Sequence, residues 1–205
     1  MEATDQAFQK KNKLKECEAL QTSIEFFVNA SGLRLRRNIP KAPIEAKSDR
    51  HLKELLEKGH RYIHVSCHGN HRELSLRRGK KFQYDRFVEV EFPSATKLLF
   101  LNACLVAGGP TSITAFASLC KGRKGEKFVI APKNEVSFET ALTFSMLFYD
   151  FLLGRHFKIV EAFHSAGSLR GFDDLAYVCL DANSMKTHTI VRGDGRCQET
   201  NLRFS

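Results

Sequence analysis

The chain has 205 residues, of which 42% are hydrophobic and 27% are charged, a composition typical of one globular domain. Its formal net charge is +9, but the basic residues are scattered and no nucleic-acid-binding motif accompanies them, which argues against a nucleic acid as partner. The polar first residues predict no signal peptide, no apolar run reaches membrane-spanning length, and the six cysteines form no CxxC pair. We therefore expect a cytoplasmic protein that has reduced thiols and no membrane partner.

Residues 5–59 predict two helices separated by a loop. Apolar residues recur at three- and four-residue spacing over residues 5–28, and Gly32 ends this first helix. The alternating but charged residues 33–39 are compatible with an edge strand, and two prolines make the following stretch a loop. Ser48 is a suitable N-cap for the second helix, which ends at Gly59.

Two apolar runs of strand length dominate the middle of the chain. The first, YIHVSCHG at residues 62–69, ends in a His-Gly pair, and the second, LLFLNAC at residues 98–104, ends in a cysteine before a glycine-containing turn. Between them, alternating segments predict short hairpin strands, the last over residues 87–92. If the two runs are parallel neighbours, their carboxyl ends lie side by side, where the sites of open α/β sheets form.

The rest of the chain continues this alternation of strands and helices. The expected elements are a helix capped by Thr111 or Ser112, a third apolar strand at residues 127–132, helices over residues 138–153 and 159–169 with Ser137 as the cap of the first, and a hairpin of strands at residues 175–180 and 187–191. Strands alternating with helices predict an α/β fold with helices on both faces of a mostly parallel central sheet. We expect residues 1–205 to form a single domain.

Cys104 and His68, at the ends of the two apolar runs, are the candidates for catalysis. A cysteine thiol with a histidine as base is a nucleophile for acyl transfer, and the predicted strand pairing would place the imidazole near the thiol. The backbone N–H groups of Gly69 and Cys104 could donate hydrogen bonds to an oxyanion. Taken alone, each side chain is also compatible with a structural role at a strand end.

Other groups have weaker chemical signals. Cys67 adjoins His68, but neighbouring strand residues point to opposite faces, so we expect Cys67 in the core. The histidines and cysteine within residues 60–71 invite a zinc interpretation, yet they follow one strand without the usual ligand spacing, and we expect no metal. Acidic residues, Glu135 among them, could line a pocket for a basic side chain, although most such residues are caps or surface charges.

The order of these motifs resembles the CHAT family of caspase-like cysteine peptidases. Residues 62–69 resemble the family's histidine strand, and residues 98–104 resemble its cysteine strand. The strand at residues 128–132 and the helix over residues 138–153 are similar to the elements that follow in the family, and residues 159–163 to its closing segment. The resemblance covers a core of residues 51–171, flanked by a weakly matched segment, residues 1–50, and by a C-terminal hairpin, residues 172–205.

The resemblance implies a caspase-like three-layer sandwich and a cysteine endopeptidase. It implies that Cys104 attacks the scissile carbonyl to form an acyl-enzyme and that His68 handles the proton, with neither cofactor nor metal. It also implies a protein substrate cut in regulated proteolysis, such as bacterial antiviral defence. A gasdermin-like pore-former would be one such substrate, and an activating partner would be one form of regulation.

The sequence departs from the family's pattern beside the cysteine. Asn102 stands where caspases have the glutamine of their specificity pocket, so we expect Asn102, Glu135 and Ser137 near the substrate, with no acidic pocket floor at Asn102. Leu105 and Val106 replace the glutamate-threonine that often follows the cysteine. The alternative function is that of a catalytically silent interaction module with the caspase fold, against which the intact Cys-His pair counts.

Overall fold

The computed structural model describes residues 16–31, 43–76, 79–109, 126–169, 177–182, 184, 186–190 and 197–201. Three expected features lie outside these residues: the start of the first helix, the edge strand at residues 33–39, and the helix after Thr111.

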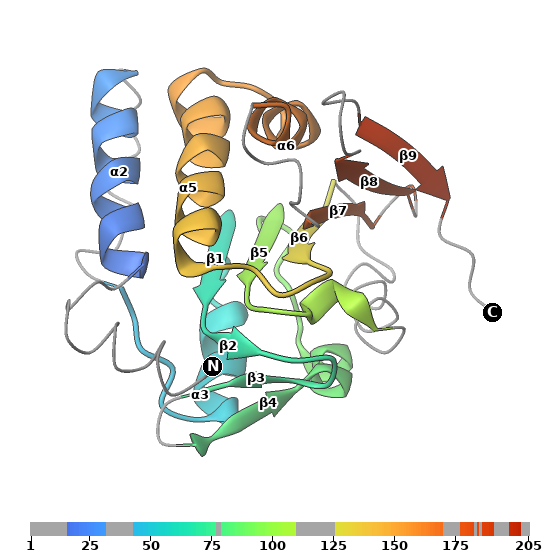
Figure 1. Cartoon of the computed structure of the whole chain (residues 1–205). Coiled ribbons are helices and arrows are strands. Elements are labelled where there is room, and N and C mark those ends of the chain that lie inside the picture. The colour runs from blue at the N-terminus through green and yellow to red at the C-terminus, as the bar shows by residue number, and fades with distance from the viewer. Residues whose placement is uncertain are drawn as a thin grey trace.

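A six-stranded sheet forms the centre of the fold (Figure 1). Its strands, in spatial order, are β1 (Tyr62–Ser66), β5 (Leu98–Asn102), β6 (Phe128–Pro132), β7 (Tyr177–Asp181), β8 (Lys186–Ile190) and β9 (Cys197–Asn201). The strands β1, β5 and β6 are parallel, whereas β7, β8 and β9 pair antiparallel. The predicted parallel pairing of the two apolar runs is therefore confirmed, and the sheet as a whole is mixed.

Helices cover both faces of the sheet. On one face lie α2 (Glu16–Ala30), α5 (Phe138–Tyr149), the π-helical turn η5 (Asp150–Gly154) and α6 (Ile159–Gly167), and on the other lie α3 (Asp49–Leu56) and the 3-10 helix η3 (Tyr84–Glu89). Because strand residues alternate in direction, Leu98 and Phe100 pack against the α5 side while Leu99 and Leu101 pack against the α3 side. The continuous apolar run of β5 is thus explained by burial on both faces.

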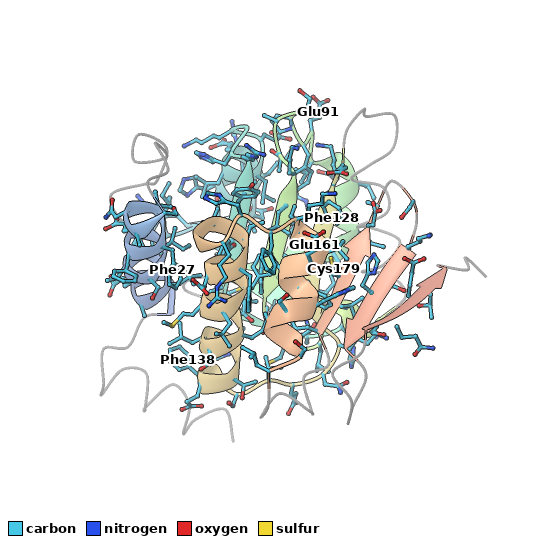
Figure 2. The ribbon with its side chains drawn as sticks, turned by 90° about the horizontal axis from the view of Figure 1, so that it is seen from above. Phe27, Glu91, Phe128, Phe138, Glu161 and Cys179 are labelled. Atoms are coloured by element: carbon cyan, nitrogen blue, oxygen red, sulfur yellow. The ribbon has the colours of Figure 1, made fainter. Side chains whose placement is uncertain are left out.

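Aromatic side chains fill the layer between α5 and the sheet. The ring of Phe100 is fully buried at the centre of this layer. Around its ring lie five others at centroid distances of 4.7–6.3 Å, namely those of His64, Phe144, Phe148, Tyr149 and Tyr177. Seen from above, α5 and α6 lie over the sheet, and the labelled Phe128 and Cys179 belong to the same apolar cluster (Figure 2).

A second, smaller sheet lies beside the carboxyl ends of the parallel strands (Figure 1). It consists of the antiparallel strands β2 (His68–Gly69), β3 (Glu73–Ser75) and β4 (Lys81–Gln83). The chain then forms η3 and not the predicted strand over residues 87–92. Phe87 is fully buried in the apolar cluster on the α3 side, so this short 3-10 helix buries the ring that the alternating pattern had suggested would be buried by a strand.

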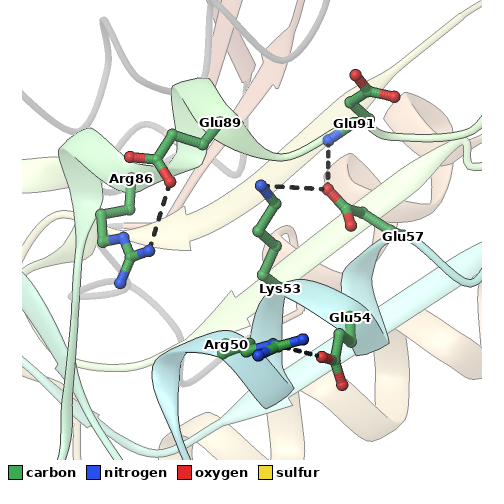
Figure 3. Close-up of polar contacts among 7 residues, drawn as sticks. All are labelled: Arg50, Lys53, Glu54, Glu57, Arg86, Glu89 and Glu91. Carbon is green, nitrogen blue, oxygen red and sulfur yellow. Dashed lines mark hydrogen bonds and ion pairs between the residues drawn. The ribbon is translucent and has the colours of Figure 1, made fainter.

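Polar contacts join α3 to the segment around η3 (Figure 3). The carboxylate of Glu57 accepts a hydrogen bond of 2.9 Å from the N–H of Glu91, and Arg86 pairs with Asp49. Three further ion pairs lie within the two segments, namely Arg50–Glu54, Lys53–Glu57 and Arg86–Glu89. Such solvent-exposed pairs contribute little to stability, so the apolar contacts of α3 hold this layer in place.

The C-terminal strands meet α6 at a pair of histidines. His164 of α6 faces His188 of β8 with ring centroids 5.5 Å apart. The Nε2 atom of His164 and the Nδ1 atom of His188 are buried, and neither has a hydrogen-bond partner within the described part of the chain. Burial and the neighbouring His188 lower the pKa of His164 below 6.5, an effect that Glu161 opposes in part. Glu199 of β9 is paired with His188 across the strands and also faces this site.

This pair predicts that the protein loses stability in mild acid. In the unfolded chain His164 binds its proton at a higher pH than in the folded chain, so the unfolded state gains protons first as the pH falls below about 6.5. We expect the urea midpoint to fall between pH 7.5 and pH 5.5, and to fall less in His164→Gln. An equal fall in the variant would show that other groups cause the acid sensitivity.

None of the described helices combines the length and the apolar character that crossing a lipid bilayer requires.

Candidate active site

The candidate site lies at the carboxyl ends of β1 and β5. The two strands pair with Ser66 opposite Asn102, and the N–H of Cys67 donates a hydrogen bond of 3.3 Å to the Asn102 carbonyl, which extends the pairing by one residue. His68 follows on the β1 side and Cys104 follows on the β5 side. The register thus brings the two predicted residues to the same edge of the sheet, as the sequence predicts.

Gly69 brings these two chain segments into direct contact. A Cβ atom placed on Gly69 would lie 2.9 Å from the Cβ of Ala103 and 3.2 Å from the carbonyl oxygen of Cys104. No side chain fits in that space, so only glycine allows the strand that carries His68 to lie against the backbone of Cys104. The imidazole of His68, at the start of this strand, is exposed to solvent.

The thiol of Cys104 is half-buried at the outer end of β5. Its Sγ atom lies 3.7 Å from the carbonyl oxygen of Val136, within reach of a weak S–H hydrogen bond. The next residue, Leu105, has a left-handed backbone with φ of 62°, and its N–H donates to the carbonyl of Asn134 at 3.2 Å. A leucine rarely adopts this conformation, and it turns the chain sharply after Cys104 into the 3-10 turn η4 (Val106–Gly108).

Two of the predicted pocket residues flank the contact of the thiol. Glu135 and Ser137 adjoin Val136 in the chain between β6 and α5, and both are exposed. Ser137 also caps α5, as predicted, since its hydroxyl oxygen accepts a hydrogen bond of 3.2 Å from the N–H of Thr140. Both residues therefore lie on the segment beside Cys104, and Ser137 stabilises the first turn of α5 there.

Asn102 has a different role from the one predicted. Its side chain is 4% exposed and lies beneath α5, where its amide nitrogen donates to the hydroxyl of Ser145 at 3.3 Å and its oxygen accepts from the hydroxyl of Tyr177. The amide thus links β5 to α5 and β7 inside the core. The expectation that Asn102 lines a substrate pocket is wrong, because both of its polar ends are bonded within the protein.

The remaining polar residues of the β1 segment separate into different layers. His64 lies against Phe100 on the α5 side, with its Nδ1 atom 3.4 Å from the Tyr149 hydroxyl. Cys67 packs against the apolar cluster on the α3 side, as expected for a core residue. Among the described residues, no three His, Cys, Asp or Glu side chains are grouped so that they could hold a metal ion.

The sequence did not predict the contacts of two residues in this region, His71 and Tyr84. The imidazole of His71 lies against the glycine turn, because a Cβ on Gly108 would be 3.1 Å from its Nδ1 and Cε1 atoms. Tyr84 is fully buried, and its hydroxyl bonds the carbonyl oxygens of Asn70 at 2.8 Å and Glu73 at 3.1 Å. A local sequence pattern cannot predict either contact, because each contact joins residues that are more than ten positions apart in the sequence.

No protein-family model matches the sequence, and a search of curated proteins finds no match. We therefore infer the function from the geometry of Cys104, His68 and the residues around them.

Proposed function

We propose that the protein is a cysteine endopeptidase with a caspase-like three-layer fold, in which Cys104 is the nucleophile and His68 is the proton carrier. The observation that carries the proposal is the contact of Gly69 with the backbone of Cys104, because it leaves these two residues on touching segments at one sheet edge. If Cys104 and His68 were unrelated residues at two strand ends, there would be no functional reason for Gly69 to pack so tightly between them.

The proposed reaction uses only these residues and water. His68 accepts the thiol proton, the thiolate sulfur attacks the scissile carbonyl carbon, and the carbonyl oxygen becomes an oxyanion. The backbone N–H groups of Gly69 and Cys104 are the proposed donors to that oxyanion. When the intermediate collapses, His68 gives the proton to the leaving amine, and a water molecule that His68 activates then hydrolyses the thioester.

The fold and the motif order support the same proposal. A sheet with helices on both faces, a histidine after one strand and a cysteine after its parallel neighbour are the features by which the sequence resembles CHAT peptidases. We extend the proposal to a protein substrate in the cytoplasm, cut in regulated proteolysis such as bacterial defence. A gasdermin-like pore-former is the proposed kind of substrate, and an activating partner the proposed form of control.

A cleavage-site profile tests this function directly. The purified protein is incubated with a proteome-derived peptide library, and new termini are read by mass spectrometry. We expect cuts with wild-type protein and with Cys67→Ala, and none with Cys104→Ala or His68→Ala, because only the last two remove a proposed reacting group. Equal cutting by Cys104→Ala would refute the assignment of the nucleophile, and no cutting by any protein would favour the silent interaction module.

A further inference from the structure

The two proposed reacting groups belong to different sheets. Cys104 follows β5 of the six-stranded sheet, whereas His68 lies in β2 of the three-stranded sheet. Among the described strands, backbone pairing does not join one sheet to the other. The distance between thiol and imidazole therefore depends on how firmly the small sheet is seated against the large one.

The turn that follows Gly69 is closed by its own hydrogen bonds. The N–H of Asn70 donates to the carbonyl of Glu73 at 3.1 Å, and the side-chain oxygen of Asn70 accepts from the N–H groups of Arg72 at 2.8 Å and Glu73 at 3.1 Å. These bonds shape the turn but do not attach it to the rest of the protein. Other contacts attach it: His71 lies against Gly108, and the backbone N–H of Tyr84 donates a hydrogen bond of 2.9 Å to the carbonyl of Arg72.

Tyr84 supplies such an attachment from the core. Its hydroxyl lies 2.8 Å from the carbonyl oxygen of Asn70 and 3.1 Å from that of Glu73, so one O–H group reaches both ends of the turn. The same hydroxyl lies 3.3 Å from where a Cβ of Gly69 would be, next to the contact with Cys104. The ring is fully buried, and it stacks on Phe87 at a centroid distance of 6.4 Å.

The surroundings keep this hydroxyl protonated. Burial raises the pKa of Tyr84 above its usual value of 10, and the nearby Cys67, Glu73 and Cys104 raise the pKa further. The phenol thus remains a neutral donor when the Cys104 thiol ionises. A lysine or histidine at this position could become charged, and burying that charge would be costly.

We propose that Tyr84 is a positioning residue for the Cys104–His68 pair, whose hydroxyl anchors the turn from Asn70 to Glu73 and so keeps the strand of His68 seated on the backbone of Cys104. This inference rests on the proposed function, because it concerns the geometry of the same two groups. Tyr84 is placed to touch the turn and Gly69, and it acts on the reaction only through them.

The matched test compares Tyr84→Phe with Tyr149→Phe. Each change removes one hydroxyl from a buried ring, and the Tyr149 hydroxyl contacts His64 on the far side of the sheet. The readout is the rate at which iodoacetamide modifies Cys104, followed site by site with mass spectrometry from pH 5 to pH 9. This rate reports the imidazole–thiol pairing without any peptide substrate.

We expect Tyr84→Phe to shift the pH profile of Cys104 modification toward that of His68→Ala, and Tyr149→Phe to keep the wild-type profile. We also expect kcat for a cleaved peptide to fall on the order of 10- to 100-fold in Tyr84→Phe, with a smaller change in KM, since the base and not the binding surface is displaced. A wild-type profile in Tyr84→Phe would overturn the positioning role.

Two further variants separate the possible failures. If His68→Ala leaves the Cys104 profile unchanged, the pair itself is absent and the proposed function fails, whatever Tyr84 does. If Tyr84→Phe does not fold, Asn70→Ala takes its place, because it loosens the same turn at an exposed side chain. A wild-type profile in folded Asn70→Ala would overturn the inference that this turn sets the geometry of the pair.

Discussion

Replacing Phe100 by alanine is expected to lower the free energy of unfolding by about 3–5 kcal/mol. The ring is 0% exposed, and five aromatic or imidazole rings surround it at 4.7–6.3 Å. Its loss would remove apolar burial and leave a cavity between β5 and α5 that the regular backbones of both elements cannot close. Urea unfolding followed by circular dichroism measures the effect.

Phe26 offers the matched control for this change. It is also a phenylalanine, but its side chain is 67% exposed on α2. We expect Phe26→Ala to change the free energy of unfolding by about 0.5 kcal/mol or less, as is usual for surface substitutions. Equal losses in the two variants would mean that the aromatic layer does not carry the stability that its burial indicates.

Replacing Gly69 by alanine is expected to separate the proposed nucleophile from its base. The new methyl group would lie 2.9 Å from the Cβ of Ala103 and 3.2 Å from the carbonyl oxygen of Cys104, and neither atom can rotate away. The small sheet must therefore move, at a cost of about 1–3 kcal/mol in the free energy of unfolding. We expect loss of peptide cleavage together with a Cys104 alkylation profile like that of His68→Ala.

Gly154→Ala is the control for adding a methyl group at a crowded glycine. Its Cβ would meet an oxygen of the Asp150 carboxylate at 2.8 Å, but this oxygen is at the end of a side chain that can turn aside. The variant should keep peptide cleavage at the wild-type rate. If Gly69→Ala also cleaves at that rate, the close seating of β2 on the Cys104 backbone is not needed for the reaction.

The parallel core of the fold follows from sequence patterns. The strands β5 and β6 are nearly continuous apolar runs, because helices cover both faces of the sheet, and such runs can be recognised from the sequence alone. The cap of α5 at Ser137 was likewise predictable, since a serine before a helical pattern commonly accepts the first free N–H groups. These features depend on residues that are near each other in the chain.

Features that depend on distant residues could not be predicted in the same way. Asn102 was expected near substrate, but it shares a face of β5 with Leu98 and Phe100 and so points beneath α5. The alternation of side chains along a strand already predicts that Asn102 shares a face with Leu98 and Phe100. The prediction of a pocket residue followed the family resemblance instead. The bonds of Tyr84 to residues 11 and 14 positions upstream have no counterpart in any local pattern.

The C-terminal strand β9 and the left-handed backbone of Leu105 were not predicted, for other reasons. The strand β9 has the polar sequence CQETN at one edge of the sheet, so it lacks the apolar signal by which strands are recognised. Leu105 adopts a left-handed conformation that leucine disfavours, and the hydrogen bond of its N–H to Asn134 helps to hold it there. Tertiary contacts decide both features.

Because the proposed reacting groups lie in different sheets, the proposed activity could be lost while the six-stranded core stays folded. Segments of a protein can open locally at lower free energy than its core, and the partly exposed strand β2 is placed for such an opening, whereas Leu74 of β3 and Phe82 of β4 are buried in the core. A molecule in which β2 has moved off the Cys104 backbone would keep its six-stranded core and its Cys104 thiol, while the proposed base would have left the proposed nucleophile. Under the proposed function, this local equilibrium would set the fraction of molecules able to cleave a substrate, and a partner that binds the closed arrangement would raise that fraction without refolding the protein.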